Sequence, residues 1–147
     1  MNEPIEILQN RWLRWGTVNN HDGKPHFHRL PLLLGKHRIS IYLHHFVGPD
    51  DARDPHDHPK WFLSIGLWGS YTETRYNSGI KAGVRKFTAP WIRWFPAEHA
   101  HQLSNCNAWT LVITGPVKRQ WGFWAGPHQW VDKQEYVDQV NEGLNNG

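Results

Sequence analysis

Short segments in which apolar and polar residues alternate constrain the fold of this chain more than any other feature. The clearest are 37–47 (HRISIYLHHFV) and 61–76 (WFLSIGLWGSYTETRY), and 91–95, 108–115 and 119–124 continue the pattern. A period of two is typical of β-strands with one buried face. Turn sequences such as GPDD, NSG and SNCN separate the segments. We therefore predict an all-β fold, an antiparallel sandwich or barrel.

The two ends of the chain have helical patterns instead. Residues 1–12 combine a capping Asn2 and an early Pro4 with apolar residues at helical spacing, which predicts a short helix. A second helix is predicted over about 132–143, with Gly143 as its stop signal. The 147 residues contain no linker or internal repeat. A single domain, 1–147, is expected, with its barrel core over about 27–131.

Composition narrows the function classes. The chain has eleven histidines and ten tryptophans, with a net charge of +3. Its lysines and arginines are scattered, so a nucleic-acid surface is not favoured. No apolar run approaches the length of a membrane span and no secretory leader is visible, so we expect a cytoplasmic protein. The single cysteine, Cys106, is expected to be a small buried apolar residue.

Two H-x-H pairs are the strongest chemical signal. His56 and His58 form one pair, and His99 and His101 form the other. On a strand, residues two apart point to the same face, so each pair places two imidazoles side by side. A third ligand must then come from elsewhere in the fold, and His101 or His99 is available on another predicted strand. Three neutral imidazoles on one side of an ion leave positions open for water or substrate, as a catalytic metal site requires.

The spacing of these residues resembles that of the cupin superfamily, whose small antiparallel barrels carry the motifs G-x5-H-x-H-x3–4-E-x6-G and G-x5-P-x-G-x2-H-x3-N. The match covers about fifty residues. The residues in register are His56, His58, Gly69, Pro96, His101 and Asn105. The resemblance implies a cupin-type barrel or jelly roll with His56, His58 and His101 as metal ligands. It also implies pairing of two copies, so we expect a homodimer.

The chain departs from the cupin motifs at four positions. Asp50, Pro90 and Glu98 stand where glycines are expected, and Phe62 replaces the glutamate ligand. The strand parity of Phe62 points it into the barrel as an apolar wall. The site then has three histidines, as in the thiol-dioxygenase branch of cupins, or is completed by Glu98 or His99. Both of these are second-rank candidates, since each is also expected as an ordinary surface or hydrogen-bonded residue.

Other residues are candidates for the surroundings of the metal. Asp57, between two ligands, is expected to point outward into solvent or to pair with Arg53. One of His44 and His45 must face inward. Five aromatic residues are candidates for the lining of a ligand pocket, because their strand positions favour the barrel interior or because their rings and hydroxyl groups can stack on a ligand or hydrogen-bond to it. These candidates are Phe62, Trp68, Tyr42, Tyr71 and Trp109.

The favoured function is a metal-dependent enzyme acting on a small polar or anionic molecule. Fe, Mn, Ni and Zn all accept imidazole ligands, and an open three-histidine site makes a dioxygenase the first choice. An isomerase or lyase is the rival within the same class. The alternative is a non-catalytic barrel that binds a sugar or another metabolite. No nucleotide-binding glycine loop is present, and the Trp/Arg doublets are better explained by packing than by nucleic-acid contacts.

Overall fold

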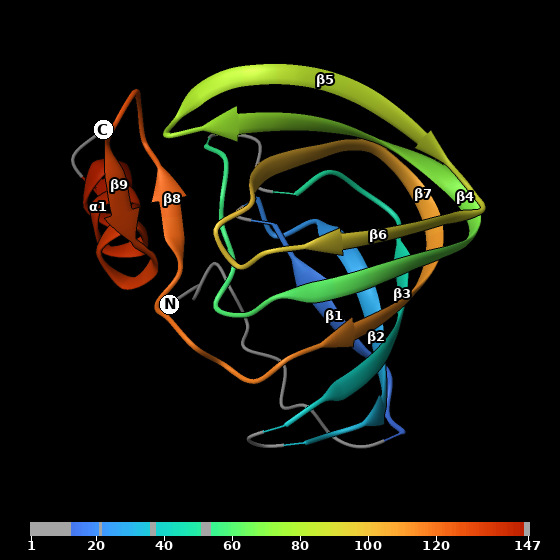
Figure 1. The fold of residues 1–147 in the computed structure, drawn as a ribbon. Helices are drawn as coiled ribbons and strands as arrows, with labels where there is room; N and C mark the ends of the chain where they lie inside the picture. Colours follow the sequence, from blue (N-terminus) through green and yellow to red (C-terminus); the bar gives the residue numbers. More distant parts are fainter. Residues whose placement is uncertain (1–12, 21, 36–37, 51–53, 146–147) are drawn as a thin grey trace.

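The computed structural model describes residues 13–20, 22–35, 38–50 and 54–145. The helix predicted within 1–12 lies outside these residues. The described part of the chain forms strands followed by one C-terminal helix (Figure 1). The elements are β1 (Gly16–Asn19), β2 (Pro25–Leu33), β3 (Ser40–Phe46), β4 (Phe62–Asn77), β5 (Ile80–Thr88), β6 (Trp91–Phe95), β7 (Ala100–Thr114), β8 (Gly122–Trp124), β9 (Trp130–Asp132) and α1 (Lys133–Asn145).

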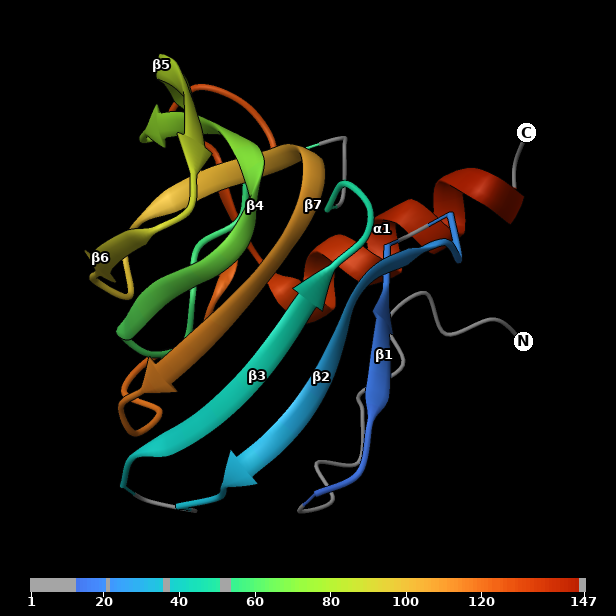
Figure 2. The same ribbon diagram turned by 90° about the vertical axis from the view of Figure 1, so that its right-hand side faces the viewer.

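The larger sheet is antiparallel throughout and curls into a barrel. Its order is β1-β2-β3-β7-β4-β5, and β6 pairs with the first half of β4. The two longest strands, β4 and β7, pair with each other along most of their length and arch around the molecule (Figure 1). Seen from the side, β1, β2, β3 and β7 form one continuous wall (Figure 2). The predicted all-β barrel is confirmed.

The long strands bend where their pairing is interrupted. The register between β4 and β7 shifts between Gly66 and Trp68, and again between Ser70 and Thr72. Gly69 has φ +84°, and a Cβ there would lie 2.0 Å from the Asn107 carbonyl oxygen, so only glycine fits. Asn105, at φ 49°, supplies the bend in β7. The prediction of a turn at SNCN was therefore wrong, because these residues lie within β7. The strand continues through the bend since asparagine tolerates the left-handed conformation that the bend requires.

The apolar core lies inside the barrel at this bend. A buried cluster there comprises Tyr71, Trp91, Leu103, Cys106 and Ala108. Cys106 is buried, as predicted, and burial raises the pKa of its thiol to about 12. The thiol therefore stays protonated and unreactive at neutral pH.

The helix α1 closes one side of the barrel together with the β8–β9 hairpin (Figure 1). It occupies the region where the second helix was expected. Tyr136 stacks on Phe123 of β8 with ring centroids 4.1 Å apart, and its hydroxyl donates to Asp54 Oδ2 at 2.7 Å. These contacts hold the segment that carries His56 and His58 against the barrel. No helix in the described residues has the length and hydrophobicity needed to cross a membrane.

Candidate metal centre

Backbone hydrogen bonds bring the three predicted ligands together. His56 and His101 exchange N–H···O bonds of 3.1 Å in both directions, and His58 N–H donates to the Ala97 carbonyl at 2.9 Å. The segment before β4 is thereby fixed alongside the start of β7. Ring nitrogens of His56, His58 and His101 all lie within 4.8 Å of one another. This spacing suits three ligands of a single ion.

Each of the three imidazoles has an oxygen near one ring nitrogen. His101 Nδ1 lies 2.9 Å from Glu73 Oε1, and His58 Nδ1 lies 3.2 Å from the His99 carbonyl oxygen. His56 Nδ1 lies 3.6 Å from Asp50 Oδ2. An oxygen partner at Nδ1 favours the tautomer whose Nε2 carries a free lone pair, as in metal-bound histidines. The structure therefore leaves Nε2 of His58 and of His101 available to an ion.

The environment also keeps these rings uncharged. Burial is the main reason why the pKa of His56 and of His58 lies well below the ordinary value, and the neighbouring imidazoles lower it further. Burial also lowers the pKa of His101, although Glu73 opposes that shift. Neutral imidazoles are the form that binds metal. The site is thus ready to accept a cation at neutral pH.

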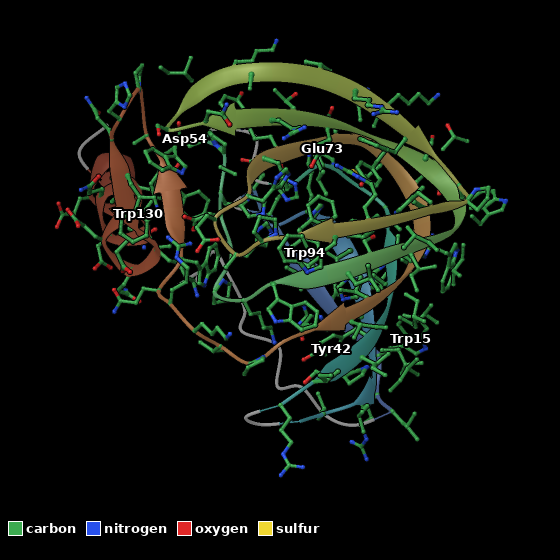
Figure 3. The ribbon with its side chains drawn as sticks, viewed as in Figure 1. Trp15, Tyr42, Asp54, Glu73, Trp94 and Trp130 are labelled. Atoms are coloured by element: carbon green, nitrogen blue, oxygen red, sulfur yellow. The ribbon has the colours of Figure 1, made fainter. Side chains whose placement is uncertain are left out.

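Glu73, which was not predicted as a site residue, is the centre of the polar network. It is fully buried on β4 and points into the barrel (Figure 3). Its Oε1 accepts from His99 Nε2 at 2.8 Å as well as from His101, and its Oε2 accepts from Arg93 Nη2 at 2.6 Å. Burial alone would raise the pKa of Glu73, but these hydrogen bonds lower it below the ordinary value. The carboxylate stays ionised.

Glu73, His99 and His101 form a second group with ligand atoms close together. In this group the hydrogen bonds already join the carboxylate to both rings. Such a carboxylate–histidine contact is the usual partner of a metal-bound imidazole. The geometry therefore suits Glu73 and His99 as supports for His101 better than as direct ligands. Glu98 is exposed and belongs to neither group.

Asp57 does not point into solvent, so that expectation was wrong. Its side chain is buried and accepts hydrogen bonds from Gly122 N–H at 2.8 Å and Trp130 Nε1 at 2.9 Å. Arg119 Nη1 completes the arrangement 2.9 Å from Oδ2. The segment that carries the H-x-H pair lies before β4 and pairs only through isolated bridges of His56 to His101 and Phe123. Its backbone contacts the β8–β9 hairpin there, so the side that was expected to face solvent is also buried. Asp57 anchors the backbone between His56 and His58.

Three predicted pocket residues are inside the barrel. Phe62 stacks on Phe95 with centroids 4.5 Å apart and lies 4.7 Å from the His58 ring, where an apolar wall was expected. Tyr71 is buried and accepts a hydrogen bond from Arg93 Nη1 at 2.5 Å. Tyr42 is also buried, toward the end of the barrel away from Glu73 (Figure 3).

Trp68 and Trp109 are not brought to the histidines. They pair with each other across β4 and β7, and Trp68 is 58% exposed. Trp109 stacks on His45 with centroids 4.3 Å apart, on the outer face of the sheet. His44, the inward member of the histidine doublet, is buried, and burial holds its pKa well below the ordinary value. The bulge in β4 changes the strand parity on which the prediction for Trp68 relied.

Comparison with solved structures identifies the architecture. A dimethylsulfoniopropionate (DMSP) lyase, DddQ from Ruegeria pomeroyi, superposes with a TM-score of 0.52 and 14% identity, over 70% of this chain and 56% of that one. An oxalate decarboxylase variant from Bacillus subtilis superposes with a TM-score of 0.50 and 10% identity, over 79% of this chain and 32% of that one. This chain has a cupin fold. The match spans only about half of the lyase chain, or less for the decarboxylase.

Neither family models nor curated protein sequences match this chain. The structural likeness at such low identity concerns the fold alone, because one fold hosts many reactions. The function must therefore be argued from the histidines and their surroundings. Arg93 offered one sequence signal for the missed network: it shares a strand face with Trp91 and Phe95, and a charged residue on a buried face requires a partner.

Proposed function

We propose that this cupin is a metal-dependent enzyme with His56, His58 and His101 as its ligands. The observation that carries the proposal is that ring nitrogens of the three histidines lie within 4.8 Å of one another, while Nδ1 of His101 and of His58 has an oxygen partner at 2.9 and 3.2 Å. Solvated histidines would have no reason to share this orientation. Held in this way, His58 and His101 keep their Nε2 lone pairs free for an ion.

The donor set suits a transition-metal ion. Three neutral nitrogen ligands match Fe, Mn, Ni or Zn, and among these we favour Fe and dioxygenase chemistry. When bound, such an ion supplies positive charge and open coordination positions. The side chain of His56 retains 19% exposure, which is consistent with access to the ion from outside.

The surrounding residues have separate tasks. Glu73 holds His101 and His99 by hydrogen bonds, and Arg93 balances its charge. Phe62 and Phe95 form an apolar wall beside His58, which excludes water from that side. Glu73 would thus orient a ligand on one side of the ion, and the two phenylalanine rings would exclude water on the other side.

A polar or anionic substrate is favoured by the rest of the barrel lining. The guanidinium carbon of Arg29 lies 4.6 Å from the centroid of the Tyr42 ring, and Lys60 Nζ lies 5.8 Å from the same centroid. Thr110 and Thr114 have buried hydroxyls without a hydrogen-bond partner among the described residues. Buried polar groups of this kind require a polar occupant or water. Together with uncharged metal ligands, these residues favour a small molecule with acceptor oxygens.

The test is the metal content of purified protein. We expect about one transition-metal ion per chain in the native protein and a loss of at least about tenfold in His56→Gln and His101→Gln. His128→Asn is the matched control, because His128 is exposed with φ 57°, which asparagine tolerates. Its metal content should equal that of the native chain. Circular dichroism confirms that each variant is folded.

A second measurement distinguishes a metal site with open coordination positions from one whose coordination is complete. Protein loaded with Fe(II) should bind nitric oxide, a probe of open coordination positions, and give a paramagnetic resonance signal that both glutamine variants lack. Retention of metal in both variants would refute the ligand assignment. Stoichiometric metal without nitric oxide binding would instead favour a structural metal and the non-catalytic binding module.

A further inference from the structure

Two positively charged side chains lie over the ring of Tyr42, toward the end of the barrel away from Glu73 (Figure 3). The guanidinium carbon of Arg29 lies 4.6 Å from the centroid of that ring, and Lys60 Nζ lies 5.8 Å from it. Arg29 belongs to β2, and its Nε donates to His44 Nε2 of β3 at 3.2 Å, which holds the guanidinium inside the sheet. We call Arg29, Tyr42 and Lys60 the cationic end of the barrel.

The cationic end carries its charges in a buried environment. Burial is the main cause that lowers the pKa of Lys60 from its ordinary value, and the charge of Arg29 lowers it further. Burial also lowers the pKa of Arg29. Lys60 takes part in no ion pair among the residues that the structure describes. A negatively charged ligand would oppose both causes at Lys60, because an opposite charge stabilises the protonated amine.

Two buried hydroxyl groups flank the same ring. Tyr42 pairs with Val112 of β7, and Thr110 and Thr114 lie two residues to either side of Val112. Side chains two apart on a strand share a face, so both threonines point into the barrel as Tyr42 does. Thr110 is 1% and Thr114 is 6% exposed, and neither hydroxyl has a hydrogen-bond partner among the described residues. Because buried hydroxyls are normally satisfied, this pair indicates a polar occupant.

The barrel lining continues from the cationic end to a proposed metal ligand. Thr114 pairs with Phe62 of β4, and the ring of Phe62 lies 4.7 Å from the ring of His58. The strands of Tyr42 and Phe62 lie on either side of β7, so two strand spacings, roughly 10 Å, separate these residues. A molecule that extends from the cationic end to the histidines therefore needs several carbon atoms between its two ends.

We propose that the cationic end binds the carboxylate of an organic acid whose apolar chain extends along Phe62 toward His58. A carboxylate has two oxygens, which accept hydrogen bonds from guanidinium, ammonium and hydroxyl groups. A phosphate group has three oxygens to satisfy, and the buried neighbours of Tyr42 in the register, Pro31 and Val112, offer no side-chain donor. Binding of the acid requires no metal, whereas its role as the substrate rests on the proposed function.

The test is calorimetric titration of the metal-free full chain with hexanoate. Hexanoate should bind to a single site. Hexanamide has nearly the same shape without the charge, and it should bind at least about tenfold more weakly. Acetate lacks the chain and hexyl phosphate carries the larger anion, so both should also bind more weakly than hexanoate does.

Substitution of Lys60 tests the location of the site. Lys60→Met removes the ammonium group at similar side-chain length and should weaken hexanoate binding at least about tenfold. Lys86→Met is the matched control, because it makes the same change of charge at an exposed position on β5. It should bind hexanoate as the native chain does.

A second variant addresses the hydroxyl groups without risk to the fold. Thr114→Val replaces a buried hydroxyl that has no partner among the described residues by a methyl group of similar size. The melting temperature of the ligand-free variant should therefore equal or exceed that of the native chain, while hexanoate binding falls by about threefold or more. Unchanged hexanoate binding in both Lys60→Met and Thr114→Val overturns the proposal.

Nuclear magnetic resonance of the imidazole groups reports how far the bound acid extends. In the metal-free native protein, hexanoate should shift the ring signals of His58, whereas acetate should not. The signals of the exposed His128 should stay in place with both acids. An unshifted His58, equal affinity for hexanoate and hexanamide, or tighter binding of hexyl phosphate overturns the proposal. If the expected results are obtained with a chain that binds no metal, the proposed function fails and the carboxylate site stands.

Discussion

At the scale of single residues, one carboxylate joins three polar side chains at the candidate metal centre. Glu73 contacts His99, His101 and Arg93, and it has no exposure to solvent. Removal of one member from such a network leaves the others buried without a partner, which costs more than the hydrogen bond itself. The position of His101 therefore depends on the charge of a residue that need not touch the ion.

Substitution of Glu73 with glutamine should separate this role from that of a ligand. We expect Glu73→Gln to lose at least about 3 kcal/mol of unfolding free energy, because Arg93 loses its buried counter-ion. Metal affinity should fall by about 10–100-fold, the usual effect of losing a hydrogen-bonded support. Chemical unfolding and competition with a chelator measure the two quantities.

Glu98→Gln is the control, since Glu98 is exposed in the turn just before His99. It should match the native protein in both measurements. If metal binding by Glu73→Gln equals that of the native chain, Glu73 does not hold His101 in its binding orientation.

The proposed ligands were predictable from motif spacing, although His56 and His58 precede β4 and do not lie on a strand. His56, His58 and His101 follow from two H-x-H pairs and their spacing, and the structure brings their ring nitrogens within 4.8 Å. Glu73 was missed because the bulge in β4 between Gly66 and Trp68 exchanges inner and outer positions between Ser64 and Tyr71. Alternation counted from the start of the strand places Glu73 outside. A bulge is set by backbone conformation, which alternation does not reveal.

At the scale of elements, the bend in β4 and β7 determines which parts of the barrel the residues of these two strands can reach. Their first and second halves face different parts of the barrel, so Phe62 and Glu73 on one strand both reach the site. The bend depends on Gly69, where a side chain would collide with the β7 backbone. The strand segments themselves were predictable from alternation, but the continuity of β7 through SNCN was not.

Gly69→Ala should therefore be costly. The substitution combines a positive φ with a clash against a backbone carbonyl, and we expect a loss of about 3 kcal/mol or more. Gly83→Ala on β5 is the control, because a Cβ there meets nothing within 4 Å. That variant should differ from the native protein by no more than about 1 kcal/mol. Thermal unfolding of both variants measures the difference, and equal melting temperatures would contradict the role given to the bend.

At the scale of the whole molecule, the barrel encloses several imidazoles that must stay neutral. His26 is one that lies apart from the proposed ligands; its Nδ1 is 2.8 Å from the Gly48 carbonyl oxygen. Burial lowers the pKa of His26 to about 4, although that hydrogen bond opposes the shift. Protonation of His101 would lower the pKa of His26 further, and a protonated His26 would in turn lower the pKa of His44 and of His56. The fold as a whole is therefore sensitive to acid.

The sign of this dependence follows from the order of the two pKa values. An unfolded histidine titrates near 6.5, so the unfolded chain takes up the proton first as the pH falls. Stability that is present above pH 6.5 is lost progressively down to about pH 4. At pH 5 the contribution of His26 amounts to about 2 kcal/mol.

We expect metal-free native protein to lose about 2 kcal/mol more unfolding free energy between pH 7.5 and pH 5 than His26→Gln does. Urea unfolding at the two pH values measures this difference. His128→Asn should behave as the native chain does, because His128 is exposed. An equal loss in the native protein and His26→Gln would show that His26 is not held neutral by the fold.

The nitrogen character of the proposed ligands has a consequence for selectivity among the ions in a cell. Magnesium and calcium are hard cations that require oxygen donors and, for calcium, six to eight of them. Two buried carboxylates lie beside the three rings. Glu73 already accepts hydrogen bonds from Arg93, His99 and His101, and Asp50 accepts one from the Leu103 N–H. The proposed site would consequently discriminate against the alkaline-earth ions, even where these are abundant, in favour of scarcer transition metals.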